Sequence, residues 1–174
     1  MCGLVQSTMS RVLIASIGVV AASNSSNTPT CSVNGAAGGQ VVTFSDGTYQ
    51  RCMSLITPSS APKPMPILWW FHGSGGNAAH CGNQRDLLSL AESTGFAFIC
   101  GEATQNVFGN GGQWDIPKKI TDQTGTPCSA SDSVEVNYMK NALAHLAKSP
   151  DTYDTSRVFT SGCSMGSAFS GYIG

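Results

Sequence analysis

The residues of this chain best suited to chemistry form the segment Gly162-Cys163-Ser164-Met165-Gly166 near its end. The segment follows a short strand-like run and has the pattern Gly-x-Ser-x-Gly, which is typical of a nucleophile elbow. In an elbow a strand turns sharply into a helix and presents a serine hydroxyl to an acyl carbon. Glycine is needed at both ends because a side chain would collide with backbone across so tight a turn. We therefore expect Ser164 to be a nucleophile and the backbone N–H of Met165 to belong to an oxyanion hole.

A second glycine-rich segment, Gly73-Ser74-Gly75-Gly76, directly follows the apolar run 67–71. Ester hydrolysis places negative charge on an oxygen, which preorganised backbone N–H groups stabilise. A glycine-rich loop after a central strand can present such groups because its backbone approaches a ligand closely. The sequence therefore predicts the second side of the oxyanion hole in the region of Ser74.

The base that such a serine needs is not evident in the sequence. No His, Asp or Glu follows Ser164, whereas in nucleophile-elbow hydrolases the acid and the histidine follow the serine in chain order. We expect His72 to bond to nearby backbone, His80 to lie in a loop and His145 to lie on an exposed helix face. The chain by itself is therefore expected to be inactive.

The N-terminus has the features of a secretory signal. Arg11 precedes an uncharged, largely apolar run at 12–22, and small residues follow near Ala22 and Ser23. The run is too short to span a bilayer comfortably. We expect residues 1–23 to be a signal peptide, residues 24–38 a polar tail and residues 39–174 the folded part of a secreted, extracellular protein without a membrane anchor after cleavage.

The 73–78 segment has a competing interpretation. It also fits the dinucleotide-binding pattern Gly-x-Gly-x-x-Ala, and Glu102 follows the next expected strand, near where a ribose-binding acid would lie. The next helix is expected only after Asn83, too late to direct its N-terminus at a pyrophosphate. An exported protein also rarely meets NAD, and this interpretation leaves residues 162–166 unexplained. A dinucleotide-binding domain nevertheless stays open as an alternative.

Cysteine content and charge restrict the class of protein further. Once Cys2 leaves with the signal, an even set suited to disulfides remains: Cys31, Cys52, Cys81, Cys100, Cys128 and Cys163. Six cysteines allow about fifteen pairings, so the connectivity stays open, with Cys163 the expected unpaired residue. The chain has no Cys-x-x-Cys pair, which argues against a structural zinc site. Nine basic and ten acidic residues give a net charge of −1, which provides no electrostatic surface for nucleic acid.

The expected elements alternate between strands and helices. Strands are expected at 39–44, 48–57, 67–71, 96–100 and from 157, with a hairpin turn at 45–47. One helix is expected at 84–92, ended by Gly95, and another from Asp132 to 148, with Glu135 completing a capping box. The uninterrupted apolar runs at 67–71 and 96–100 are typical of strands buried on both faces. Together these features favour an α/β fold with a mostly parallel sheet and crossover helices.

In order and spacing, these segments resemble the N-terminal part of the secreted polyhydroxybutyrate depolymerase and feruloyl or acetylxylan esterase group of the α/β-hydrolase superfamily. The matching residues are 47–51, 68–76, 114–117, Asp132 and 153–166. The resemblance implies that residues 39–174 are a partial α/β-hydrolase domain, truncated after the nucleophile elbow. It also implies a serine carboxylic-ester hydrolase that works through an acyl-enzyme, with Ser164 as nucleophile and an oxyanion hole at Ser74 and Met165.

The resemblance further implies an ester substrate, which can be polymeric, such as a polyester or a plant cell-wall polysaccharide with feruloyl or acetyl esters. It implies no metal or organic cofactor. Cys163 is a departure, because many members carry an apolar residue there; in tannase-like esterases a cysteine at this place bonds a cysteine beside the catalytic histidine. A non-catalytic secreted α/β module also stays open as an alternative.

Overall fold

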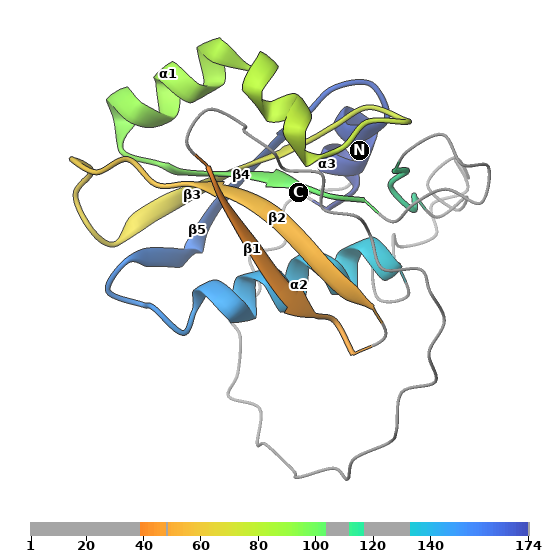
Figure 1. Cartoon of the computed structure of the whole chain (residues 1–174), viewed down its shortest axis with the longest axis horizontal. Coiled ribbons are helices and arrows are strands. Elements are labelled where there is room, and N and C mark those ends of the chain that lie inside the picture. The colour runs from red at the N-terminus through yellow and green to blue at the C-terminus, as the bar shows by residue number, and fades with distance from the viewer. Residues whose placement is uncertain (1–38, 48, 104–111, 117–132, 174) are drawn as a thin grey trace, which may run out of the picture.

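A computed structural model of the protein describes residues 39–47, 49–103, 112–116 and 133–173 (Figure 1). The expected signal peptide and polar tail lie outside the described residues, as do Cys31, Cys128 and Asp132. Within the described ranges, no helix has the length and apolar character needed to cross a membrane.

The described strands form one mixed sheet in the order β1-β2-β4-β3-β5. The strands are β1 (Gln40–Ser45), β2 (Gln50–Ile56), β3 (Met65–Phe71), β4 (Ala97–Gly101) and β5 (Tyr153–Gly162). β3 pairs in parallel with both β4 and β5, whereas β2 is antiparallel to both β1 and β4. The α/β class is confirmed, and the described part of the sheet is mixed rather than mostly parallel, because the β1–β2 hairpin adds two antiparallel pairings at one side.

Helices cover both faces of this sheet. They are the 3₁₀ helix η1 (Ala78–Asn83) and the α-helices α1 (Arg85–Thr94), α2 (Val134–Leu146) and α3 (Met165–Ile173). Figure 1 shows α1 on one side of the sheet and α2 on the other. Successive side chains of β3 alternate between the two layers: Trp69 packs in the cluster with α2 and α3, and Trp70 in the cluster with α1 and η1. A strand buried in this way on both faces is uniformly apolar.

The helix α1 follows its sequence prediction closely. It runs from Arg85 to Thr94, and Gly95 ends it in the left-handed conformation (φ 79°), with its N–H donating to the Ala91 carbonyl. Ala91 is buried, and Leu87 and Leu88 pack against the same cluster. The expected end at Gly95 is confirmed.

The start of α2 differs from its prediction. Ser133, rather than Asp132, caps the helix, with its Oγ accepting from the Val136 N–H. Glu135 has its Oε2 atom 2.6 Å from Nη2 of Arg51, while the expected capping box with Asp132 lies outside the described residues. A buried guanidinium needs a nearby anion, and Glu135 supplies one.

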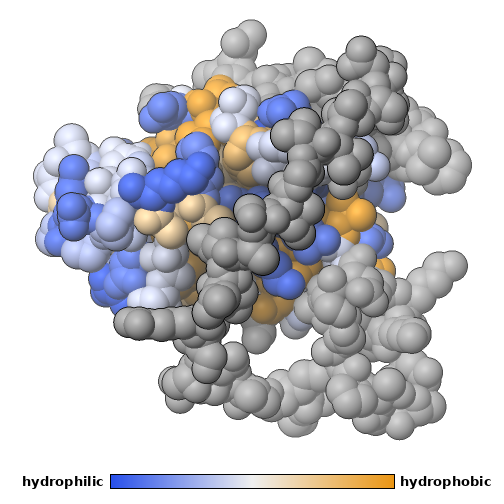
Figure 2. Space-filling model, turned by 90° about the horizontal axis from the view of Figure 1, so that it is seen from below, coloured by the Kyte–Doolittle hydropathy of each residue, from blue (hydrophilic) through white to orange (hydrophobic). Residues whose placement is uncertain are grey.

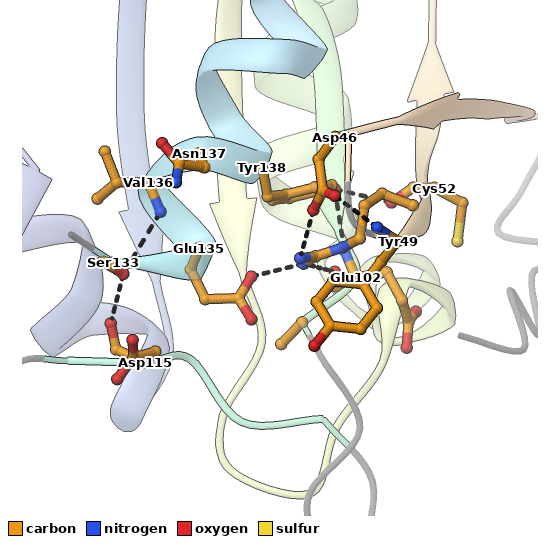
Figure 3. Close-up of polar contacts among 12 residues, drawn as sticks. Asp46, Tyr49, Cys52, Glu102, Asp115, Ser133, Glu135, Val136, Asn137 and Tyr138 are labelled. Atoms are coloured by element: carbon orange, nitrogen blue, oxygen red, sulfur yellow. Dashed lines mark hydrogen bonds and ion pairs between the residues drawn. The ribbon is translucent and has the colours of Figure 1, made fainter. Parts of the chain in front are cut away.

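Arg51 joins several elements inside the fold, and Figure 3 labels its partners Asp46, Glu102, Glu135 and Tyr138. Its side chain is fully buried, and besides Glu135 it approaches Asp46 (Nη1–Oδ2, 3.4 Å). Nη2 also donates to the carbonyl oxygen of Glu102 (3.2 Å), and the guanidinium lies 4.3 Å from the ring centre of Tyr138. The β1–β2 hairpin, the end of β4 and the first turn of α2 are therefore held by one cation.

The described cysteines differ in their bonding state. Cys81 and Cys100 form a disulfide that connects η1 to β4, and Cys52 is also disulfide-bonded. Cys163 is free and exposed. The expectation that Cys163 is the unpaired residue is confirmed among the cysteines that the structure describes.

Exposed apolar side chains do not gather on one element. Figure 2 shows the face on the α2 side, where hydrophilic residues cover most of the left part and hydrophobic ones reach the surface nearer the middle. The large exposed hydrophobic residues of the described ranges are Val41, Leu90, Val134 and Phe159. They belong to four different elements, and scattered exposure of this kind needs no functional explanation.

We expect Arg51→Met to lower the free energy of unfolding by about 3–5 kcal/mol, because it removes the cation that faces a buried Glu135 carboxylate. The double variant Arg51→Met/Glu135→Leu should recover much of this loss, since it also removes the buried anion. Urea denaturation followed by circular dichroism measures both. Arg157→Met, which removes an exposed ion pair with Asp154, is the control and should change little. A double variant no more stable than the single one would contradict this account.

Candidate functional site

The segment 162–166 forms the sharp turn that its sequence predicts. β5 ends at Gly162 and α3 begins at Met165, so two residues make the whole connection. Ser164 has φ 52°, a left-handed conformation that a residue with a side chain rarely adopts. The Cys163 N–H donates to the Phe71 carbonyl (3.1 Å), which ties the turn to the neighbouring strand β3. Such backbone strain persists only where the surrounding structure enforces it, and it concentrates at functional sites.

The two glycines of the turn have a steric reason. A Cβ atom on Gly162 would lie 2.7 Å from the backbone nitrogen of Ser167, and one on Gly166 would lie 2.5 Å from the carbonyl oxygen of His72. The Gly166 Cβ would also collide with the Phe71 carbonyl. The first turn of α3 therefore packs directly on the end of β3, and this contact excludes any side chain.

The loop at 73–77 lies beside this turn. β3 and β5 pair in parallel up to Phe71 and Gly162, so their carboxyl ends meet at one edge of the sheet. A Cβ on Gly73 would lie 3.4 Å from both the Cys163 carbonyl oxygen and the Ser164 Cβ. The structure thus brings together the two segments in which Ser74, Ser164 and Met165 were expected to act. Their catalytic roles remain predictions.

A pocket of about 280 Å³ opens between the 73–77 loop and the turn. It is lined by Trp70, Gly73, Ser74, Gly75, Gly76, His80, Asn83, Gln84 and Cys163. An aromatic side chain with amide and imidazole groups suits an uncharged polar organic group better than an ion. Among the residues that the structure describes, no group of three His, Cys, Asp or Glu side chains could hold a metal ion.

His72 has the structural role that the sequence predicts. It is completely buried, its Nδ1 lies 2.7 Å from the Gly73 carbonyl oxygen, and its Nε2 lies 3.3 Å from the Ala103 nitrogen. Since the Ala103 N–H must donate, Nε2 is the acceptor and Nδ1 carries the proton. Burial lowers the pKa of His72. Both ring nitrogens are engaged by backbone, so this imidazole is not free to act as a base.

The other two histidines differ somewhat from their predictions. His80 is exposed, but it lies within η1 rather than in an irregular loop. His145 is half-buried on α2, with its ring centre 6.1 Å from that of Phe44. The expected exposed position of His145 is wrong, because Phe44 of the β1–β2 hairpin packs against it.

Glu102 does not have the environment of a ribose-binding acid. It is only 3% exposed, and its Oε2 accepts from the Ala78 N–H at 2.6 Å. Burial raises the pKa of its carboxyl to about 7, although the Ala78 N–H and the Arg51 charge oppose this shift. The α-helix after the loop begins only at Arg85. These observations weigh against the dinucleotide-binding alternative.

Some contacts to the 73–77 loop were not foreseen from the sequence. Gly75 donates to the Gly112 carbonyl (3.0 Å), and Gly112 donates to that of Gly76 (3.1 Å). The Gln113 amide donates to Ser74 Oγ (2.9 Å). The buried Trp114 donates to the His72 carbonyl (2.8 Å). A glycine two residues before a tryptophan was the available signal, but nothing in the sequence shows which strand end these residues approach.

No protein-family model matches the chain, and no curated protein matches it. Among solved structures, it is similar to a mutant of the esterase rPPE, with 17% identity over 76% of this chain and 36% of that one (TM-score 0.45). It is also similar to a bacterial heroin esterase, with 20% identity over 76% and 37% (TM-score 0.43). A ferulic acid esterase from the anaerobic fungus Anaeromyces mucronatus shares 12% identity over 85% and 57% (TM-score 0.42).

The chain thus spans between about a third and three fifths of the length of these esterases. Identities and TM-scores this low define no family for the chain. The functional argument accordingly depends on the geometry of the turn and the loop.

We expect Gly166→Ala to lower the free energy of unfolding by about 3 kcal/mol or more, because its Cβ would overlap two backbone carbonyls that cannot move independently of β3. Gly171, in the same helix, has open space around its Cβ position. Gly171→Ala is therefore the matched control and should be neutral or up to about 1 kcal/mol more stable. Chemical denaturation of both variants measures the difference. Equal effects would show that α3 does not pack on β3 in this way.

Glu102→Gln should change how stability depends on pH. A carboxyl whose pKa is raised on folding binds its proton more tightly in the native state, so stability falls as pH rises from about 4.5 through about 7. The variant lacks this loss. It should match the parent near pH 4 and exceed it by about 1–3 kcal/mol near pH 8. Denaturation at several pH values measures this, with Glu92→Gln on the exposed part of α1 as the control variant.

Proposed function

We propose that this chain carries the nucleophile and oxyanion-hole part of a serine carboxylic-ester hydrolase with an α/β-hydrolase fold. The observation that carries the proposal is the left-handed conformation of Ser164 (φ 52°) at a strand-to-helix turn whose glycines leave no room for side chains. A solvent-exposed serine held in this way is the defining feature of a nucleophile elbow.

The oxyanion hole in this proposal has two sides. The N–H of Met165 lies in the first turn of α3, where no preceding helical carbonyl is available to accept it. The second donor comes from the 73–77 loop, in the region of Ser74. Donors fixed before the reaction stabilise the alkoxide without reorganising, and each one contributes about 10²–10³-fold to the rate.

The reaction would follow the usual course of serine esterases. The Ser164 Oγ attacks the ester carbonyl carbon while its proton passes to a base, and the alcohol leaves with a proton returned by that base. The remaining acyl-enzyme is then hydrolysed by water. Since both ring nitrogens of His72 are engaged, we assign the base and the acid to residues that follow Ser164 in a longer protein.

The location and the substrate belong to the same proposal. A secreted protein fits the signal-like N-terminus, and the Cys81–Cys100 disulfide supports an oxidising compartment. The substrate class is an ester that can be polymeric, either a polyester or a feruloyl or acetyl ester of plant cell-wall polysaccharide. The pocket is lined by no Asp, Glu, Lys or Arg side chain among the described residues, which supports a neutral ester.

The proposal predicts that residues 1–174 alone do not turn over p-nitrophenyl acetate above the buffer rate, because a serine hydroxyl is a weak nucleophile without a base. A longer form with a downstream acid and histidine should be active, and Ser164→Ala should lower its kcat by about 10⁴-fold or more. Exposed Ser167→Ala, one turn into α3, is the matched control and should retain activity.

Two results would contradict this assignment in different ways. Activity that survives Ser164→Ala would remove the nucleophile. Full activity of residues 1–174 that Ser164→Ala abolishes would keep the nucleophile but place the base within this sequence, and His80→Ala, in the wall of the pocket, would then be the next variant to assay.

A further inference from the structure

Two consecutive residues after β4 hold the two ends of the 73–77 loop. At the far end, the Glu102 carboxylate accepts from the Ala78 N–H at 2.6 Å. At the near end, the Ala103 N–H donates to the His72 ring (3.3 Å), and that ring donates to the Gly73 carbonyl (2.7 Å). Both ends of the loop are therefore hydrogen-bonded to the two residues that follow β4. We call this pair of contacts the clamp.

This clamp is buried and is itself rigidly held. Glu102 is 3% exposed, and Ala78 and Ala103 have no exposed surface, so water does not compete for these bonds. The Glu102 N–H donates to the Tyr138 hydroxyl (3.2 Å), and its carbonyl accepts from Arg51. Figure 3 shows Glu102 in this surrounding of labelled side chains from the β1–β2 hairpin and α2.

We propose that Glu102 is a positioning residue that sets the conformation of the 73–77 loop and so directs the loop's amide donors toward the reacting ester carbonyl. This inference rests on the proposed function, since the loop is treated as one side of an oxyanion hole. Glu102 is buried and does not touch the substrate; it acts through the Ala78 N–H and the start of η1.

The hydrogen bonding at the start of η1 explains why an acceptor is needed there. The first N–H groups of a helix have no partner within it. Asn77 Oδ1 accepts from the Ala79 N–H (3.0 Å), and Glu102 supplies the acceptor for the Ala78 N–H. Without Glu102, the buried N–H directly after the loop would have no acceptor, and the chain would have to shift to find one.

The presence of a carboxylate at position 102, where a glutamine would also fit, favours a positioning role over a purely structural one. Burial raises the pKa of Glu102 to about 7, so an ionised carboxylate here costs stability near neutral pH. A neutral glutamine could fill the same space at lower cost. An ionised acceptor instead makes a shorter and stronger bond to a backbone N–H, which restricts the loop more tightly. The titratable groups that face this carboxyl are Arg51 from β2 and Glu135 and Tyr138 from α2.

The amide resonance of Ala78 tests the inference directly on residues 1–174. In ¹H–¹⁵N spectra from about pH 5 to 9, its proton should move downfield with a midpoint near 7, as the carboxylate that accepts it ionises. In Glu102→Gln the resonance should not titrate. Glu135→Gln removes a neighbouring negative charge and should lower the midpoint, whereas Asp154→Asn, at the start of β5, should leave it unchanged.

Hydrogen exchange then reports on the loop itself. Glu102→Ala should speed exchange of the Ala78, Gly75 and Gly76 amides by about tenfold, the loss expected for one buried hydrogen bond. Glu102→Gln, which keeps an acceptor oxygen, should lie between this variant and the parent. If Glu102→Ala does not fold, Glu102→Gln provides the test. The loop amides of that variant should exchange faster than those of the parent at the same pH.

Two results would overturn the inference. One is an Ala78 resonance that does not titrate in the parent, and the other is loop exchange that is unchanged in every folded Glu102 variant. These measurements need no substrate, so their failure leaves the assignment of Ser164 standing. If Ser164 proves inert in the longer form, the hydrogen bonds that hold the loop still stand as measured. Only the proposed link between these bonds and catalysis is then lost.

Discussion

The backbone contact between Gly166 and the end of β3 is the constraint on which the rest of the site depends. Because a Cβ on Gly166 would meet the carbonyls of Phe71 and His72, α3 begins directly against its neighbouring strand. That closeness forces the connection from β5 into two residues and puts Ser164 in a left-handed conformation. It also brings the loop after β3 next to the serine. One steric fact thus positions both the candidate nucleophile and the candidate oxyanion donors.

Apolar core packing and buried charged side chains meet at the end of β4. Packing favours apolar groups there, and the residues around Trp69 and Tyr138 satisfy that demand. Yet this is also where Arg51, Glu135 and Glu102 lie, all of them almost without solvent contact. Charged groups in such a place add little to net stability even when paired. Their presence is better explained by what they hold: a hairpin, a helix start and a glycine-rich loop, each in one arrangement.

The sequence predicted features that depend on neighbouring residues, but it did not predict contacts between residues far apart in the chain. Gly95 ends α1 because only its own backbone conformation matters. The spacing of Gly162 and Gly166 predicts a turn because a Cβ on Gly162 would meet the backbone of Gly166, four residues further along. The ion pair of Glu135 was not foreseen, because its partner Arg51 lies 84 positions away in the sequence. The role of Glu102 was missed for a related reason: its partner, the Ala78 N–H, is identified only once β4 lies beside β3. The antiparallel placement of β2 against β4 likewise depends on pairing partners that the sequence does not specify.

The Cys81–Cys100 disulfide has a consequence for how the loop reaches its native shape. It joins η1 to β4 across a sequence separation of 19 residues, with Ala78 a few residues before one cysteine and Glu102 two residues after the other. In an unfolded chain with this bond intact, the Ala78 amide and the Glu102 carboxylate cannot diffuse far apart. Their encounter then has the high effective concentration of an intramolecular reaction, so the loop re-forms quickly whenever it opens. In a reducing solution that advantage disappears, and the same hydrogen bond must be found by a search over a much larger volume.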